Sequence, residues 1–404
     1  MNAPAGTGRG GWSVVFGLLL VMAVCHGIIT SALPTLDKVL LSELRISRAD
    51  LKLRESIFLL ASGCSGLAIG FLTQIVQPRT IVLSGLALLT ATLMAYSQAA
   101  TIGQIYALYV LLGACYASSH VVIVVLMVRE CLQARQALAI SVALSGTSLG
   151  SAIFPNVSVM ALAHSNWRHV LMMLAVMPIV VLPIAAWLLP RETAKREAAE
   201  TCSAVPAARS RPPAYSIGLL LAAIFGIFFS STAILLNLFL HLQDIGLSQT
   251  AAAAGLSAVF FVGLIGKVLV GAAAERWGIY RVWTSQQCIL LVGAALLAVA
   301  KPTVAVPGLL LLGMGWAGCY VLTQVVISEV FSGTNLGKVA GGFIVFEAIS
   351  SGSGVWSAAA LFDVYGSYRF AFELCCCLMA MAIAATLLFR RSMAEQAQLA
   401  LANG

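Results

Sequence analysis

The sequence predicts an all-α membrane protein with twelve transmembrane helices, arranged as two six-helix bundles that repeat one another in parallel. Three observations lead to this fold class. Only 9% of the 404 residues are charged and 60% are hydrophobic, whereas a soluble domain has about 25% charged residues. About a dozen apolar runs approach the ~20 residues that span a bilayer. Features of the first half also recur in the second half at a fixed distance.

The apolar runs are separated by Pro, Gly and charged residues, and these breaks define the predicted spans. Twelve spans with short loops use almost all of the 404 residues, which leaves no room for a separate soluble domain. No small-residue cleavage site follows the first run, so we interpret it as a retained span and not as a signal peptide. The predicted spans are 12–36, 51–76, 79–98, 103–128, 136–163, 167–190, 215–242, 249–274, 281–300, 304–330, 338–362 and 367–390.

A single long polar segment, 191–214, interrupts this pattern. It is rich in charged residues, Ala and Pro, and such a segment cannot bury a core. We therefore expect a flexible cytoplasmic linker over 191–214, an N-terminal six-helix bundle over 1–190 and a C-terminal six-helix bundle over 215–404.

Two anchors indicate that the halves are copies of one unit. The segment that starts at Gly70 follows the second span, and the segment that starts at Gly271 follows the eighth, 201 positions later (271 − 70). The segments 166–168 and 367–369 open the sixth and twelfth spans with the same offset (367 − 166). Because each unit has an even number of spans, the two copies share one orientation, and substrate is expected to bind between them near the midplane.

The basic residues indicate topology. The net charge is +8, but Lys and Arg are scattered over short loops and form no patch that suits a nucleic acid. One set of alternating loops, with both termini, holds fourteen of them and the other set holds eight. We therefore place both termini in the cytoplasm. We also expect the chain to lie in the cell inner membrane. Five of the eight are assigned to one loop: Lys38, Arg45, Arg48, Lys52 and Arg54.

Sequence motifs of enzymes are absent. There is no Gly-x-Ser-x-Gly, phosphate loop or His-Glu-x-x-His, and no pair of carboxylates at catalytic spacing. The ten cysteines show no Cys-x-x-Cys spacing, so we interpret them as buried thiols. We expect no catalytic residues, no metal and no cofactor.

Titratable residues inside apolar spans are the strongest functional signal. A charge in hydrocarbon costs several kcal/mol, so such residues normally face a water-filled path. His120, Lys267 and Glu347 lie in the fourth, eighth and eleventh predicted spans. Each is about 12–13 Å from a cytoplasmic marker by helical rise, which places all three near the midplane.

These residues have functional and structural interpretations. Lys267 can attract an anionic substrate, or it can pair with Glu347. Glu347 can carry a proton, or it can be a neutral hydrogen-bonding group in a closely packed helix. His120 and His26 can bind substrate or relay protons, or they can simply be hydrogen-bonded within their spans.

Two tyrosines occupy almost equivalent places in the two halves. Tyr116 lies in the fourth predicted span and Tyr320 in the tenth. Either can give a substrate an aromatic wall and a hydroxyl donor, and helix packing is the alternative interpretation.

The loop after the eighth span resembles the signature Gly-x-x-x-Asp-Arg-x-Gly-x-Arg of the major facilitator superfamily. The matching residues, with Glu in place of Asp, are Gly271, Glu275, Arg276, Gly278 and Arg281. The resemblance implies a conformational latch, in which the carboxylate at a helix end holds a neighbouring helix. The first-half copy is degenerate and has Gln74 where the acid belongs.

Within that superfamily the chain resembles monocarboxylate transporters and their bacterial oxalate/formate relatives. The similar parts are the Gly-Gly-Trp of 10–12, the segment 135–155 and the segment 347–368. Lys267 stands where that family has an Arg that grips the substrate carboxylate. A Lys retains the positive charge but lacks the bidentate geometry of Arg.

The leading prediction is a secondary transporter of a small organic anion, most simply a carboxylate, that works as a monomer by proton symport or anion exchange. Its partners are the anion, H+ and the lipid bilayer. The first alternative is a proton-driven exporter of drugs or metabolites. Exporters of cationic compounds usually have acids in mid-span of the amino-terminal half, whereas Asp37 and Glu55 lie near a helix end. The second alternative is a membrane sensor that has lost transport.

Overall fold

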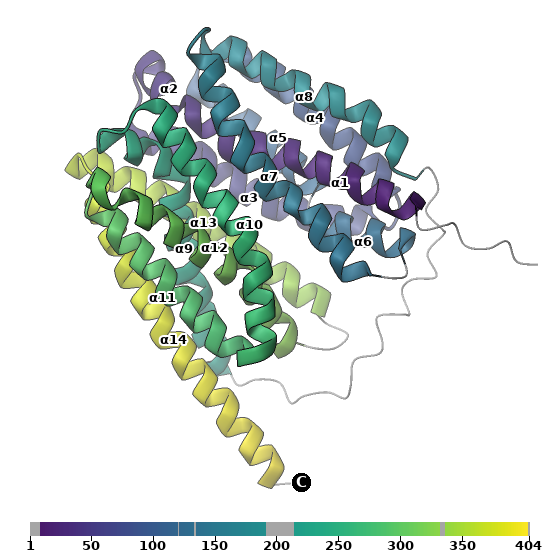
Figure 1. The fold of residues 1–404 in the computed structure, drawn as a ribbon, viewed down its shortest axis with the longest axis vertical. Coiled ribbons are helices and arrows are strands. Elements are labelled where there is room, and N and C mark those ends of the chain that lie inside the picture. The colour runs from purple at the N-terminus through teal and green to yellow at the C-terminus, as the bar shows by residue number, and fades with distance from the viewer. Residues whose placement is uncertain (1–8, 120, 133–134, 191–213, 332–335, 403–404) are drawn as a thin grey trace, which may run out of the picture. The chain divides into compact units, whose positions relative to one another are not determined.

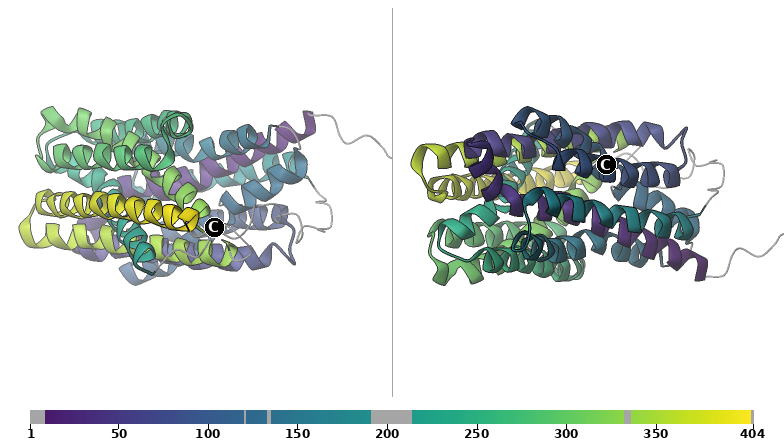
Figure 2. Two further views of the ribbon diagram at one scale, coloured as in Figure 1. Left: turned by 90° about the horizontal axis from the view of Figure 1, so that it is seen from below. Right: turned by 90° about the horizontal axis from the view of Figure 1, so that it is seen from above.

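The computed structural model describes residues 9–119, 121–132, 135–190, 214–331 and 336–402, and these residues are helical apart from short connections (Figures 1 and 2). Twelve helical stretches among them are long and apolar enough to cross a membrane. The prediction of an all-α protein with twelve spans is therefore confirmed. The predicted linker 191–214 lies outside the described residues except for Ala214, where the seventh span begins.

The described residues pack into two compact units, which we consider separately. The first consists of residues within 1–196 and 249–260, and the second of residues within 197–248 and 261–404. Helices of the first half are α1 (Arg9–Gly27), α2 (Asp37–Leu44), α3 (Arg48–Leu72), α4 (Pro78–Ser97), α5 (Ile102–Ser118), α6 (Val121–Cys131), α7 (Gln136–Leu162) and α8 (Trp167–Leu188). Those of the second half are α9 (Ala214–Asp244), α10 (Gln249–Trp277), α11 (Ile279–Ala298), α12 (Pro302–Val330), α13 (Leu336–Tyr365) and α14 (Arg369–Ala402).

The helix starts follow from local sequence. Ser47 caps α3 by accepting a hydrogen bond from the Asp50 backbone N–H (3.0 Å), and Asn166 caps α8 in the same way through the His169 N–H (2.9 Å). Such caps satisfy amides that have no partner inside the helix. Gly278 precedes α11 with φ of 86°, a conformation that residues with a side chain rarely adopt.

The first span departs from the predicted single helix over 12–36. After α1 the chain forms a π-helical turn (Ile28–Ala32) and a 3₁₀ turn (Leu33–Leu36), and α2 extends the span to Leu44. Pro34 has no N–H to donate to the preceding turn, and Thr35 Oγ1 donates to the Ala32 carbonyl (2.6 Å). The sequence pattern detected the span but not the change of helix type within it.

Small residues set the closest approaches between helices. In the first unit a Cβ at Gly150 of α7 would lie 1.9 Å from the backbone oxygen of Ala23 on α1. In the second unit a Cβ at Gly354 of α13 would lie 2.3 Å from the backbone oxygen of Phe229 on α9. Glycine allows this spacing because it lacks a side chain. The first and seventh spans thus each have a close neighbour four spans later in the chain.

Contacts that correspond between the units support the predicted repeat. Trp167 opens α8 and Tyr368 precedes α14, 201 positions apart (368 − 167), and both side chains are buried. Thr30 Oγ1 lies 3.4 Å from Ser151 Oγ on α7, and Thr232 Oγ1 donates to Ser351 Oγ on α13 (3.1 Å). These hydroxyl pairs lie at the same offset to within one residue.

Candidate functional site

Aromatic side chains from three helices meet in the first unit. The rings of His26 on α1 and Tyr116 on α5 have centroids 4.0 Å apart, and Phe58 on α3 meets Tyr116 edge-on at 5.2 Å. His26 is almost fully buried, whereas Tyr116 is half-buried. The structure therefore brings two of the predicted substrate residues, His26 and Tyr116, into direct contact.

A cation and three aromatic rings meet in the second unit. Lys267 Nζ on α10 lies 5.6 Å from the ring centroid of Trp316 on α12. Trp316 stacks on Tyr320 at 6.5 Å, and Tyr320 contacts Phe228 on α9 at 6.3 Å. A positive charge over the face of an indole ring is electrostatically favourable. Lys267 and Tyr320, which the sequence singled out separately, thus both contact Trp316.

Two glycines beside Lys267 allow α10 to approach α12. A Cβ at Gly266 would lie 3.0 Å from Met314 Sδ, and a Cβ at Gly263 would lie 3.4 Å from the Trp316 ring. A methyl group at Gly266 would press on Met314, whereas one at Gly263 would be in ordinary van der Waals contact with Trp316. The small residues thus leave room for α10 to pack against α12 beside Lys267.

Glu347 on α13 is held by a side-chain amide from α12, the helix that also carries Trp316 and Tyr320. Gln324 Nε2 donates to Glu347 Oε1 (2.9 Å), and the Glu347 side chain is buried. Trp316, Tyr320 and Gln324 are spaced by four residues, so they lie on one face of α12. This α12 face contacts both titratable residues predicted for the second half, Lys267 at one end and Glu347 at the other.

The remaining predicted residues lie elsewhere. His120 is outside the described residues. Glu275 and Arg276 are exposed in the last turn of α10, and Arg281 is exposed at the start of α11. A Cβ at Gly271 would meet no atom within 4 Å. The latch assigned to these residues and Gly278 stays a prediction.

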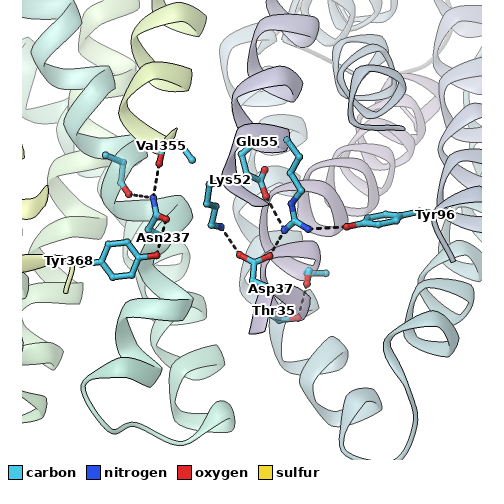
Figure 3. A network of polar contacts seen from close by, with 11 residues as sticks. Thr35, Asp37, Lys52, Glu55, Tyr96, Asn237, Val355 and Tyr368 are labelled. Atoms are coloured by element: carbon cyan, nitrogen blue, oxygen red, sulfur yellow. Dashed lines mark hydrogen bonds and ion pairs between the residues drawn. The ribbon is translucent and has the colours of Figure 1, made fainter. Parts of the chain in front are cut away.

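Sequence reasoning missed an ionic network in the first unit, which we name the Asp37 cluster: Asp37, Lys52, Arg54, Glu55, Tyr96 and Tyr109. Lys52 Nζ lies 2.6 Å from Asp37 Oδ2, and Arg54 Nη2 pairs with Asp37 Oδ1 (Figure 3). Arg54 Nη1 donates to the Tyr96 hydroxyl (2.9 Å). All of these side chains are buried, with exposed fractions of 0–1%.

The Asp37 cluster corrects the assignment of Lys52 and Arg54 to a loop. Both residues lie in the first two turns of α3, and the loop is confined to residues 45–47. Hydropathy alone could not reveal this, because a charged segment next to an apolar run is normally the solvated end of a helix. The available signal was the presence of Asp37 and Glu55 at the ends of this segment, since two carboxylates can balance two buried cations.

Buried polar groups inside the spans of a multi-pass membrane protein are typical of a transporter. Comparison with known proteins identifies the family. Residues 15–355 match the Major Facilitator Superfamily. The chain belongs to this superfamily, and it is a transporter and not an enzyme. No curated protein matches its sequence.

Solved structures share the fold at low sequence identity. A mutant of the nucleoside transporter NupG superposes with a TM-score of 0.73 at 13% identity, covering 94% of this chain and 99% of that one. A bacterial homologue of the human lysosomal transporter Spinster, inward-facing and unoccupied, gives 0.78 at 14% identity, covering 97% and 99%. Its inward-facing occupied form gives 0.76 at 13% identity, covering 98% and 99%. These likenesses establish the major facilitator fold.

Proposed function

We propose that the chain is a secondary transporter of a small organic anion, with a carboxylate as the substrate class, and that it works by alternating access with proton symport or anion exchange. The observation that carries the proposal is Lys267, a cation inside a membrane span that lies over Trp316. The resemblance to monocarboxylate transporters supports it. We also propose the inner membrane as the location, cytoplasmic termini and a monomeric state.

The surroundings of Lys267 suit a small carboxylate. The ammonium group supplies one positive charge, which is worth more in a low-dielectric span than in water. Trp316 and Tyr320 offer apolar walls for the body of the substrate, and the Tyr320 hydroxyl is a hydrogen-bond donor. His26, Tyr116 and His120 keep their predicted roles in substrate contact, and Glu347 keeps its predicted role as a proton carrier.

A proton-driven exporter of cationic compounds is the second candidate. It gains support from Asp37 and Glu55, two carboxylates buried in the amino-terminal half. Lys52 and Arg54 compensate both charges, however. A cationic substrate would therefore have to displace a side chain of the cluster, which makes this candidate weaker than an anion transporter.

The test is uptake of a labelled panel of compounds into proteoliposomes, with and without a pH gradient. The panel contains carboxylates of different length, neutral analogues of the same shape and organic cations. We expect saturable uptake of at least one carboxylate, with neutral analogues excluded. Uptake of cations in exchange for protons, with no carboxylate transported, would replace this proposal with the exporter.

A further inference from the structure

The Asp37 cluster contains more charge than the fold requires, as its counterpart in the second unit shows. Asn237 lies 200 positions after Asp37 (237 − 37), within one residue of the repeat offset, and it is also fully buried. Its amide donates to the backbone carbonyls of Ala233 (2.8 Å) and Val355 (3.2 Å) and accepts from the Tyr368 hydroxyl (3.1 Å; Figure 3). A neutral side chain thus occupies the neighbouring place in the second unit with its polar atoms hydrogen-bonded.

The partners of Asp37 have no charged counterparts either. At the offset of 201, the positions of Lys52, Arg54 and Glu55 correspond to an alanine, a glycine and a leucine: Ala253, Gly255 and Leu256. Buried ion pairs contribute little net stability, because desolvation offsets their attraction. Since the repeat is built without these ions in one half, the fold as such does not require them in the other.

The two carboxylates of the cluster are held unequally. Asp37 pairs with Lys52 (2.6 Å) and with Arg54. Among the described residues, Glu55 accepts one long bond, from Arg54 Nη2 (3.4 Å). Arg54 Nε is buried and has no hydrogen-bond partner among the described residues. The guanidinium therefore has one N–H donor that no described residue uses. Because Glu55 makes fewer and longer contacts with cations than Asp37, neutralising Glu55 breaks fewer ionic interactions than neutralising Asp37.

We propose that Glu55 is a proton-binding site of the first unit. A proton adds to a carboxylate oxygen of Glu55, the long bond from Arg54 Nη2 breaks, and Arg54 stays with Asp37. The charged and titratable groups around it are Asp37 on α2, Lys52 and Arg54 on α3, Tyr96 on α4 and Tyr109 on α5. Protonation changes the cluster from neutral to a net charge of +1.

This site deepens the proposed function, because it names the proton as the coupling ion. Phe58 follows Arg54 by one turn of α3, a rise of about 6 Å, and Phe58 contacts Tyr116, which contacts His26. A net positive charge that appears one turn from these aromatic residues favours the entry of an anion. The link to transport rests on the proposed function, but proton binding itself does not.

The first test is a pH-difference infrared spectrum of the full chain in liposomes without substrate. All variants carry Glu347→Gln, so that the buried carboxyl group of the second unit does not contribute. We expect the C=O band of a protonated carboxyl group to appear as pH falls. The band should be lost in Glu55→Gln and kept in Glu373→Gln, a control that removes an exposed carboxylate paired with Arg369 (2.8 Å).

The proposal would be overturned if the C=O band titrated in the same way with and without Glu55→Gln in the Glu347→Gln background. If Glu55→Gln does not fold, Glu55→Asp replaces it, because it keeps the carboxyl group on a shorter side chain. The titration midpoint of the band should then move, and an unchanged midpoint would count against Glu55.

The second test measures coupling with Glu347 intact. Glu55→Gln should retain carboxylate exchange and lose accumulation driven by a pH gradient. Accumulation equal to that of wild type would show that Glu55 does not couple protons to transport. If the wild-type chain transports no carboxylate, the proposed function fails, and the infrared titration still decides on the proton site.

Discussion

Lys267 is the residue proposed to neutralise the charge of the substrate, because its ammonium group lies inside a span against Trp316. We expect Lys267→Ala to abolish carboxylate uptake, since the compensating charge is lost in a low-dielectric site. Lys267→Arg should retain part of it, because it keeps the charge. Initial uptake rates in proteoliposomes with equal amounts of folded protein provide the measurement.

Lys301→Ala is the matched control for Lys267, because Lys301 is an exposed lysine just before α12. It should transport at the wild-type rate. Wild-type rates in Lys267→Ala would remove Lys267 from the substrate site.

Asp37 holds two buried cations, so its loss should damage the fold. Asp37→Asn leaves Lys52 and Arg54 with one carboxylate instead of two, and removal of one partner from a buried ion pair costs about 3–5 kcal/mol. We expect a lower Tm in detergent, partly restored by the additional substitution Lys52→Met, which rebalances the charge. An unchanged Tm in Asp37→Asn would mean that water or another group already compensates the cations.

The sequence singled out individual candidate residues but not the side chains that contact them. Lys267 and Tyr320 stood out because a charge or a tyrosine in an apolar run is visible without structure. Their common neighbour Trp316 did not, since a tryptophan in a span is normally a packing residue. The Asp37 cluster was missed because its members come from four helices, and only the fold brings them together.

Among the helices, the pairs α1 with α7 and α9 with α13 depend on glycine. We expect Gly150→Ala to destabilise the protein by at least about 1–3 kcal/mol, because the new methyl group would meet the Ala23 backbone at 1.9 Å. Gly354→Ala should behave similarly against Phe229. Thermal unfolding in detergent measures both.

Gly66→Ala on α3 is the control for these substitutions. A Cβ at Gly66 would meet no atom within 4 Å, and alanine favours a helix by up to ~1 kcal/mol over glycine. This variant should therefore be as stable as wild type or slightly more stable. Equal stability of Gly150→Ala and Gly66→Ala would show that α1 and α7 can move apart freely.

The helix types within the first span show the limit of prediction for single elements. Apolar length defines a span, because every backbone group in lipid must be satisfied inside the chain. Length does not distinguish an α-helix from one that contains π and 3₁₀ turns, since all of them satisfy the backbone. Pro34 and the side-chain bond of Thr35 accompany the change of helix type after Gly27, and a hydropathy pattern registers neither of them.

For the whole transporter, we expect the exposed turn at Glu275 to influence the equilibrium between the inward-open and outward-open conformations. Glu275→Gln should change the accessibility of single cysteines from the two membrane faces more than it changes substrate affinity, because the predicted latch acts on the conformational equilibrium. Labelling with an impermeant thiol reagent measures accessibility. Identical labelling of wild type and Glu275→Gln from both faces would exclude a latch at this residue.

The fold class was predictable because composition and length leave few alternatives. Hydrophobic residues make up 60% of the chain, more than the core of a soluble domain could bury. The chain is therefore expected to form membrane spans, and their number follows from its length. The contacts that the sequence could not supply are polar ones inside the spans, because they depend on which helices become neighbours.

The Asp37 cluster also has a consequence for the biogenesis of the protein. Inserted alone, each of Lys52 and Arg54 would cost about 2.5–3.5 kcal/mol at the centre of a membrane, and less near its surface. Their counter-charge, Asp37, belongs to the preceding span, which leaves the ribosome earlier. The second span therefore enters the lipid most easily while the first is still beside it at the translocon. We expect the two to insert as a helical hairpin and not one after the other.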